Sequence, residues 1–198
     1  MADQRSRRRD LFVQAASQGG FFTAAQAKDI GYSYQAQAHH VAAGNWTRID
    51  HGLFRLTDWT PEPDDDLRRW TLWSRGVAVV SHQSALAVHG IGEFESSRIH
   101  LTVPASFRKT NPVLALHRGA LANDEIEEHR GFATTTVLRS MLDVAALSPD
   151  AEQLAAAIDE ALAEGRLTRR MLRAAAESID PLAALHVERA LTLNDGAQ

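Results

Sequence analysis

The hydrophobic pattern near the start of the chain predicts three short helices. Apolar residues recur at helical spacing in residues 5–17, and a pair of glycines ends that segment. Thr23 stands just before residues 24–30 and Ser33 just before residues 34–43, and each hydroxyl suits the N-cap of a helix. Such small helices bury little apolar area, which favours a role other than stability alone.

A hairpin is predicted directly after these helices. Apolar and polar residues alternate in NWTRIDHGLFRL (residues 45–56) around Asp50-His51-Gly52, which is typical of two strands joined by a turn. Helix, helix-turn-helix and a two-stranded wing follow one another in a winged helix-turn-helix, whose third helix lies in the major groove of DNA. Small three-helix units also serve as plain scaffolds, so the pattern alone leaves both roles open.

The predicted third helix has an inward side and a polar outward side. Val41 faces inward, and two further residues share that side, Tyr34 at about 20° and Gln37 at about 40° from it. Gln35 and His39 lie about 120° and 160° away and face outward, with Ala36 among them to let a backbone approach. Glutamine can pair with adenine, and histidine can donate to guanine or a phosphate. The alternative is that both side chains are merely solvated.

Hydroxyls and cations around this helix are candidates for phosphate contacts. Thr23 and Ser33 stand at helix starts, where phosphates bind readily, and Arg48 and Arg55 lie in the predicted wing. The alternative for Thr23 and Ser33 is that they only cap their helices.

A domain boundary is predicted at DWTPEPDDD, residues 58–66. This stretch holds two prolines and a run of acids and lacks apolar periodicity. We expect residues 1–60 to form the winged helix-turn-helix and residues 61–198 to form a mixed α/β domain with a helical C-terminal end. The expected fold class is α+β.

The second part of the chain shows both helical and strand patterns. Helices are predicted at residues 67–75, at 81–89, and in three segments that open at 148–149, 168 and 180–181. An extended piece is predicted at 77–80, with strands at 98–103 and 113–117 and a third strand near 126–134. Four residues are expected in the core: Leu138, Met141, Leu142 and Ala145. Asp143, between them, is expected to point outward or to be paired.

Charge is distributed unevenly between the two parts. The net charge is −4, with +2 in residues 1–60 and −6 in residues 61–198. Four of the N-terminal cations are Arg5, Arg7, Arg8 and Arg9. A small basic module on an acidic body is consistent with binding to DNA, although a merely solvated terminus has the same charge.

The composition also indicates a compartment. Cysteine is absent, which excludes disulfides and thiolate metal sites and fits a reducing cytoplasm. The N-terminal arginines are followed by no apolar run, and no stretch approaches the ~18 apolar residues that span a bilayer. We expect a soluble cytoplasmic protein that makes no membrane contact.

The order of these motifs resembles the AbiEi family of bacterial antitoxins. The resemblance rests on GGFFTAAQAKDIGYSYQAQAHHVAAGNWTRIDHGLFRL, followed by SHQSALAVHGIG, RIHLTVP and TTTVLRSMLDVAAL. It covers nearly the whole chain, is strongest in residues 19–56, and is weaker from Ser81 to Leu147. It implies an N-terminal winged helix that binds double-stranded repeats in its own promoter, and a C-terminal domain that counteracts a nucleotidyltransferase-like toxin, in toxin–antitoxin pairs of phage defence and stress systems.

One feature departs from the family pattern. Relatives carry several arginines or lysines in the third helix, and this chain has none there. Phosphate contacts would then fall on Arg5, Arg7, Arg8, Arg9, Lys28, Arg48 and Arg55. If about four phosphates are contacted, the slope of log affinity against log salt is roughly −4. The affinity gained from charge neutralisation is then modest, and we expect self-association on DNA or binding to repeated sites to compensate for it.

Nuclease chemistry is not indicated by the acidic residues. Such a site needs grouped acidic ligands for Mg²⁺ near a lysine. The chain has two lysines, Lys28 and Lys109, and neither has the required spacing from a glutamate. Nor does a nucleophile turn surround Ser81 or Ser84. We expect no catalytic residue and no cofactor.

The nine histidines do not form a metal motif along the sequence. His39 and His40 are adjacent and point to different faces. His82 and His89 lie two turns apart on one predicted helix, ~10 Å, which is too far for one zinc ion. We therefore expect no metal site. The remaining alternative function is a winged-helix regulator whose second domain senses a ligand or partner, with no toxin.

Overall fold

The computed structural model describes residues 4–94, 96–147 and 149–196, which divide into two compact units. The first unit runs to Val77 and includes the hairpin tip Glu128–Phe132; the second contains Ala78–Glu127 and the chain from Ala133 onward. The contact boundary lies beyond the predicted one because the helix after the acidic stretch packs with the first unit. The division of function at residues 60 and 61 stays a prediction.

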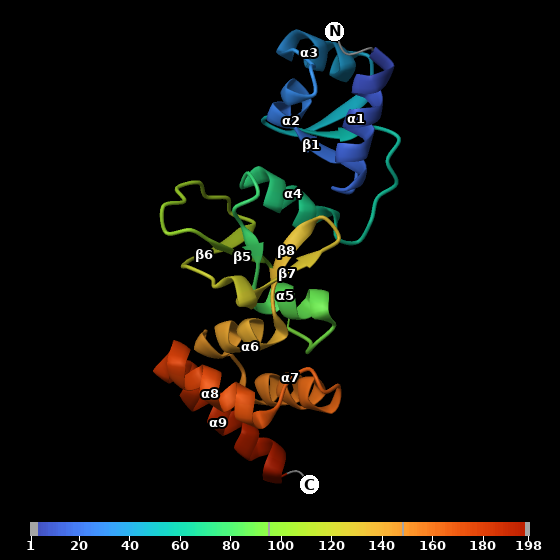
Figure 1. Ribbon diagram of the computed structural model, residues 1–198. Coiled ribbons are helices and arrows are strands. Elements are labelled where there is room, and N and C mark those ends of the chain that lie inside the picture. Colours follow the sequence, from blue (N-terminus) through green and yellow to red (C-terminus); the bar gives the residue numbers. More distant parts are fainter. Residues whose placement is uncertain (1–3, 95, 148, 197–198) are drawn as a thin grey trace. The chain divides into compact units, whose positions relative to one another are not determined.

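The first unit is built on a small antiparallel sheet (Figure 1). Its elements are α1 (Gln4–Ala16), β1 (Phe21–Thr23), α2 (Ala24–Asp29), α3 (Tyr34–Ala42), β2 (Trp46–Asp50), β3 (Leu53–Leu56) and α4 (Asp65–Trp73). The strand order is β1-β3-β2. The three helices and the hairpin are confirmed, and β1 is an addition, because its pairing with residues 53–55 is not visible in three residues of sequence.

Aromatic rings fill the core of the first unit. Trp46 packs against Phe22, Tyr32 and Phe54, with ring centroids between 4.8 and 5.9 Å apart. These rings close over the buried Leu11, Ala15 and Ala27 from α1 and α2. The wing is thereby fixed to the helices by its first strand.

The acidic stretch before α4 is part of an ion-pair network. Asp65 binds both Arg55 of β3 and Arg68 of α4, and Arg68 also binds Glu62. The Arg68 side chain is buried, and its Nε donates to the carbonyl oxygen of Arg130 at 2.8 Å. The stretch is therefore anchored to the first unit.

The second unit contains the strands of a five-stranded sheet of order β6-β5-β4-β8-β7. Its strands are β4 (Val79–Val80), β5 (Ile99–Val103), β6 (Leu114–Arg118), β7 (Ile126–His129) and β8 (Phe132–Thr135), the last two sharing the hairpin tip with the first unit. The single strand predicted near 126–134 is thus two strands. A short 3₁₀ turn, Asn123–Glu125, precedes β7.

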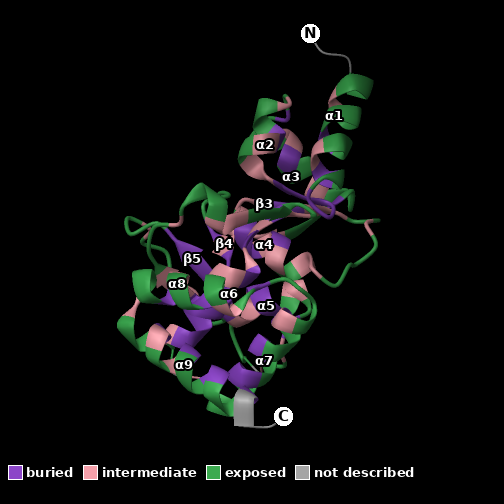
Figure 2. Cartoon of the chain, turned by 60° about the horizontal axis from the view of Figure 1, so that its bottom comes forward, coloured by how far each residue is buried: buried purple, intermediate pink, exposed green. Residues whose placement is uncertain are grey.

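Helices form the rest of the second unit. They are α5 (His82–His89), α6 (Val137–Ala146), α7 (Ala151–Ala163), α8 (Arg169–Ile179) and α9 (Pro181–Gly196). Their inward faces form one apolar core (Figure 2). Met141, Leu142 and Ala145 are buried in it, and Leu138 packs against it. Asp143 is buried and paired with Arg139, which settles the alternative left by the sequence.

The fold class is α+β, as predicted. Among the described residues, no helix is both long and apolar enough to cross a membrane.

Candidate nucleic-acid interface

Each helix of the helix-turn-helix begins at a side-chain cap. The backbone N–H of Gln26 donates to Thr23 Oγ1 at 3.2 Å, and the N–H of Thr23 donates to Gln26 Oε1 at 2.8 Å. The N–H of Ala36 donates to Ser33 Oγ at 3.2 Å. Thr23 and Ser33 therefore cap α2 and α3, while their contact with phosphate stays a prediction.

A buried glutamine fixes α3 against α2. Gln37 is 2% exposed, and its Nε2 donates to the carbonyl oxygens of Ala24 and Tyr32 at 3.0 and 2.9 Å. The inward position predicted for Gln37 is confirmed. Val41 is half-buried against the same core.

The inward position predicted for Tyr34 is wrong. Its side chain is 63% exposed. Tyr34 is the first residue of α3, and side chains on a helix lean toward its N-terminus, so the ring extends past the core instead of into it. The Lys28 ammonium lies over this ring, 5.4 Å from its centroid.

An uncharged polar ridge runs along the outer side of α3. Gln35, Ala38, His39 and Ala42 are all exposed within the first unit. Ala36, predicted on this side, is instead half-buried and packs against the core. Ala38 and Ala42 are therefore the small exposed residues on this side, which the sequence pattern did not indicate because the helical wheel placed Ala36 there.

The histidine at the back of this ridge is held by aromatic packing. The His40 ring stacks on Trp46, with centroids 4.6 Å apart and planes 14° from parallel. Burial lowers the pKa of His40, and the nearby His39 and Arg8 charges lower it further. Arg8 of α1 thus lies near His40 of α3.

The predicted cations differ in how free they are. Arg8, Lys28 and Arg48 are exposed. Arg55 is half-buried, pairs with Asp65, donates to the carbonyl oxygen of Thr60 and lies over the Phe21 ring. Because its guanidinium already has these partners within the first unit, Arg55 is less available for the predicted phosphate contact.

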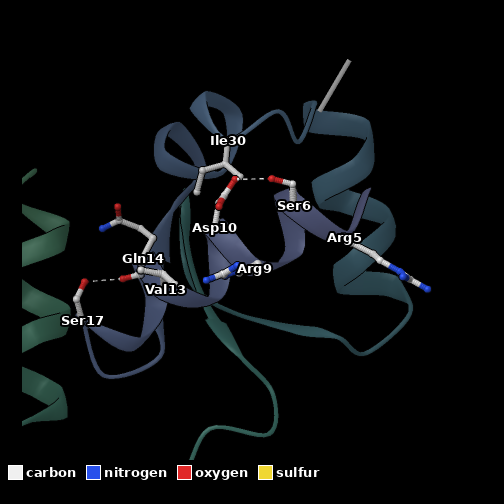
Figure 3. A pocket seen from close by; sticks show the side chains of 8 residues that line it. All are labelled: Arg5, Ser6, Arg9, Asp10, Val13, Gln14, Ser17 and Ile30. Atoms are coloured by element: carbon white, nitrogen blue, oxygen red, sulfur yellow. Dashed lines mark hydrogen bonds between the residues drawn. The ribbon is translucent and has the colours of Figure 1, made fainter. Parts of the chain in front are cut away.

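Arg5 and Arg9 line a shallow groove on α1 (Figure 3). The other lining residues are Ser6, Asp10, Val13, Gln14, Ser17 and Ile30. Within it Ser6 Oγ donates to Asp10 Oδ2 at 3.3 Å. The carboxylate of Asp10 makes this groove less favourable to phosphate than the side that carries Arg8. Arg7 donates to the carbonyl oxygen of Gly31 at 3.1 Å, which ties α1 to the turn before α3.

Metal ligands are not gathered at this interface. In the described part of the chain the one cluster with suitable geometry is His82, His100 and His117, and it lies in the second unit.

The fold is similar to one already solved. The crystal structure of the RV2827C protein from Mycobacterium tuberculosis superposes with a TM-score of 0.61 at 12% sequence identity, over 93% of this chain and 77% of that chain. At this identity the likeness concerns the fold alone. No curated protein matches the sequence.

A sequence family does match the segment that carries the interface. Residues 13–57, which include β1, α2, α3 and the wing, match the family described as "Transcriptional regulator, AbiEi antitoxin". The segment that carries the interface is therefore similar to this family of transcriptional regulators.

Proposed function

We propose that this chain represses its own operon by binding promoter repeats and that it counteracts a nucleotidyltransferase-like toxin in the cytoplasm. The observation that carries the DNA-binding half is the exposed ridge of Gln35 and His39 on a helix held by the buried Gln37. A helix presented in this way, followed by a wing, is the arrangement that reads the major groove.

The proposed contacts divide into two kinds. Gln35 and His39 contact base edges, while Ala38 and Ala42 allow close approach. The phosphate contacts are assigned to Thr23, Lys28, Ser33, Arg48 and Arg8, with Arg5 and Arg9 as further candidates. Arg55 positions the wing through Asp65. Few cations face the DNA, so binding to repeated sites, with or without self-association, supplies the remaining affinity.

The antitoxin half is assigned to the second unit. Its last two helices expose five large apolar side chains: Met171, Ile179, Leu182, Leu185 and Leu193. These side chains are the proposed contacts for the toxin. The family match lies in the first unit and supports regulation by DNA binding. It gives no information on how a toxin would be bound.

The test for DNA binding is a gel-shift titration with the operon's promoter fragment. Gln35→Ala and His39→Ala are each expected to weaken binding about 5- to 100-fold, because a lost base contact costs ~1–3 kcal/mol. Gln153→Ala, an exposed glutamine of the second unit, is the matched control. Unchanged affinity in both interface variants would remove the recognition role of α3.

The toxin half needs a separate assay. The operon's neighbouring nucleotidyltransferase-like protein is expressed with the wild type, with Gln35→Ala, or with Leu185→Asp. We expect Gln35→Ala to rescue growth fully and Leu185→Asp to rescue it poorly. Absence of such a neighbouring gene would favour a regulator whose second unit senses another ligand or partner.

A further inference from the structure

Three histidines from three separate elements converge in the second unit. His82 opens α5, His100 lies on β5 and His117 lies on β6. Each offers a ring nitrogen, and these nitrogens all lie within 4.8 Å of one another. His100 Nδ1 is 3.0 Å from His117 Nε2, and the rings of His82 and His117 stack with centroids 3.5 Å apart.

The sheet brings two of these side chains to one face. In the parallel pairing of β5 with β6, Thr102 lies opposite His117, and His100 is two residues before Thr102. Side chains two apart on a strand share a face, so His100 and His117 point to the same side. The start of α5 brings His82 over them.

The cluster is largely buried. His82 and His100 are buried and His117 is half-buried. Burial disfavours a charged ring. Neutral imidazole, with a free lone pair, is the form that binds metal ions.

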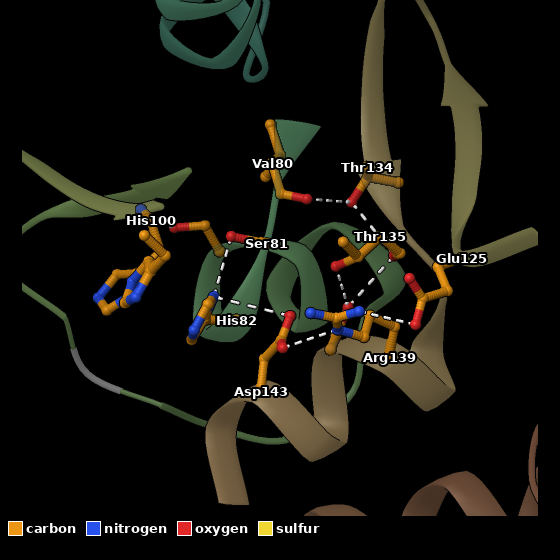
Figure 4. Close-up of polar contacts among 12 residues, drawn as sticks. Val80, Ser81, His82, His100, Glu125, Thr134, Thr135, Arg139 and Asp143 are labelled. Atoms are coloured by element: carbon orange, nitrogen blue, oxygen red, sulfur yellow. Dashed lines mark hydrogen bonds and ion pairs between the residues drawn. The ribbon is translucent and has the colours of Figure 1, made fainter. Parts of the chain in front are cut away.

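An unpaired carboxylate oxygen faces the cluster (Figure 4). The Asp143 side chain is 9% exposed, and its Oδ1 accepts from Arg139 Nε at 2.8 Å. Its Oδ2 is buried, has no hydrogen-bond partner, and lies 3.9 Å from His82 Nδ1. A carboxylate behind a histidine is the usual support for a metal ligand, because it holds the ring and raises its basicity.

The backbone of His82 is also unusual. Its φ is 55°, in the left-handed region that residues other than glycine seldom occupy. Such strain persists where the surroundings hold it, and it gathers at functional sites. Here it aims a buried imidazole at two others.

We propose that His82, His100 and His117 bind one transition-metal ion, with Zn²⁺ as the first candidate. Three imidazoles and an open fourth position are a common zinc arrangement. Zinc–nitrogen bonds of about 2.0–2.1 Å place tetrahedral ligand atoms about 3.4 Å apart. The His100–His117 contact therefore opens slightly. Ser81 Oγ and Asp143 Oδ2 lie near His82 Nδ1, which leaves its Nε2 for the ion. This inference does not depend on the proposed function.

The experiment is metal titration of tag-free, chelator-treated full-length protein. Zn²⁺ alone is added in competition with a chromophoric chelator, and Co²⁺ is used as a spectroscopic probe. We expect one equivalent bound, a rise in melting temperature, and visible Co²⁺ bands free of thiolate absorption, since the chain has no cysteine.

Variants locate the bound ion. His82→Asn keeps a residue that tolerates positive φ, and His117→Gln removes the more exposed ligand. Each is expected to lower Zn²⁺ affinity at least 10-fold. The matched control is His51→Gln, which removes an exposed histidine outside the cluster and is expected to leave Zn²⁺ affinity unchanged.

Three outcomes would overturn the site: no stoichiometric uptake, uptake that survives both cluster variants, or uptake lost in the His51→Gln control. If a cluster variant does not fold by circular dichroism, X-ray absorption at the zinc edge of the wild type decides. Three imidazole ligands support the site, and two or fewer reject it.

Discussion

The side-chain amide of Gln37 donates to the carbonyl oxygen of Tyr32 at 2.9 Å and, with the same nitrogen, to that of Ala24. The carbonyl of Ala24 belongs to the first turn of α2, and that of Tyr32 belongs to the turn before α3. One buried amide thus holds the two helices at a fixed angle, which decides how the ridge of α3 is presented.

Replacing this amide with an apolar side chain should therefore destabilise the first unit. Gln37→Leu leaves two carbonyl oxygens without their donor, and we expect a loss of about 1–3 kcal/mol in the free energy of unfolding. Urea denaturation followed by tryptophan fluorescence measures it. Gln35→Leu, two positions away on the exposed side, should change stability by less than about 0.5 kcal/mol. Equal losses of stability in the two variants would contradict the stabilising role of the Gln37 hydrogen bonds.

The two arginines of the wing should behave differently. Arg48 is exposed, so Arg48→Ala should weaken DNA binding and make the slope of log affinity against log salt shallower by about 1. Arg55 pairs with Asp65, so Arg55→Ala should cost about 1–3 kcal/mol of stability by removing one of the two arginines that bind that carboxylate.

Both quantities are measured on both variants, by fluorescence anisotropy at several salt concentrations and by urea denaturation. If the slope of log affinity against log salt becomes shallower by about 1 in Arg55→Ala, and its free energy of unfolding is unchanged, Arg55 would again be assigned a phosphate contact.

Close packing at one glycine should make its substitution costly. Gly20 has φ 82°, and a Cβ added there would clash with the Trp59 ring. Gly44 has a similar φ of 75°, but a Cβ there meets nothing within 4 Å. Gly44→Ala should therefore cost only the backbone strain, about 1–2 kcal/mol, whereas Gly20→Ala should add an overpacking cost of about 1–3 kcal/mol.

Thermal denaturation of the two alanine variants separates these costs. Equal melting temperatures would show that Trp59 moves aside freely.

The pKa of His40 should lie below the ordinary value of 6.5. Burial beneath the aromatic cluster disfavours its charged form, and His39 and Arg8 add repulsion. The neutral ring therefore contributes stability that is present above pH 6.5 and is lost as the pH falls through the lower pKa of the folded state.

An NMR titration of the histidine ring protons measures this pKa. Arg8→Ala should raise it, because a positive charge is removed. A pKa at or above 6.5 in the wild type would contradict the burial of the ring.

Local signals in the sequence were enough for the helices and the hairpin of the first unit. Thr23 and Ser33 each accept a hydrogen bond from the backbone N–H three residues later in the chain. The alternation around Gly52 likewise spans only a few residues. Neighbouring positions are therefore enough to specify these elements. The same signals placed Gln35, Gln37 and His39 on their correct sides of α3. The acidic stretch at 58–66 marked where the pattern changes, but nothing in it showed that Asp65 would be paired.

Contacts between distant residues decided the rest. The pairing of Phe21 with Arg55, the binding of Arg55 by Asp65, and the exposure of Tyr34 all depend on what the folded chain places nearby. The histidine cluster shows this most clearly, because His82, His100 and His117 are 17 or more residues apart and share no helix or strand. Periodicity reports which side of one element a residue occupies, whereas the meeting of several elements is set by how their apolar faces pack, and only the tertiary structure contains that information.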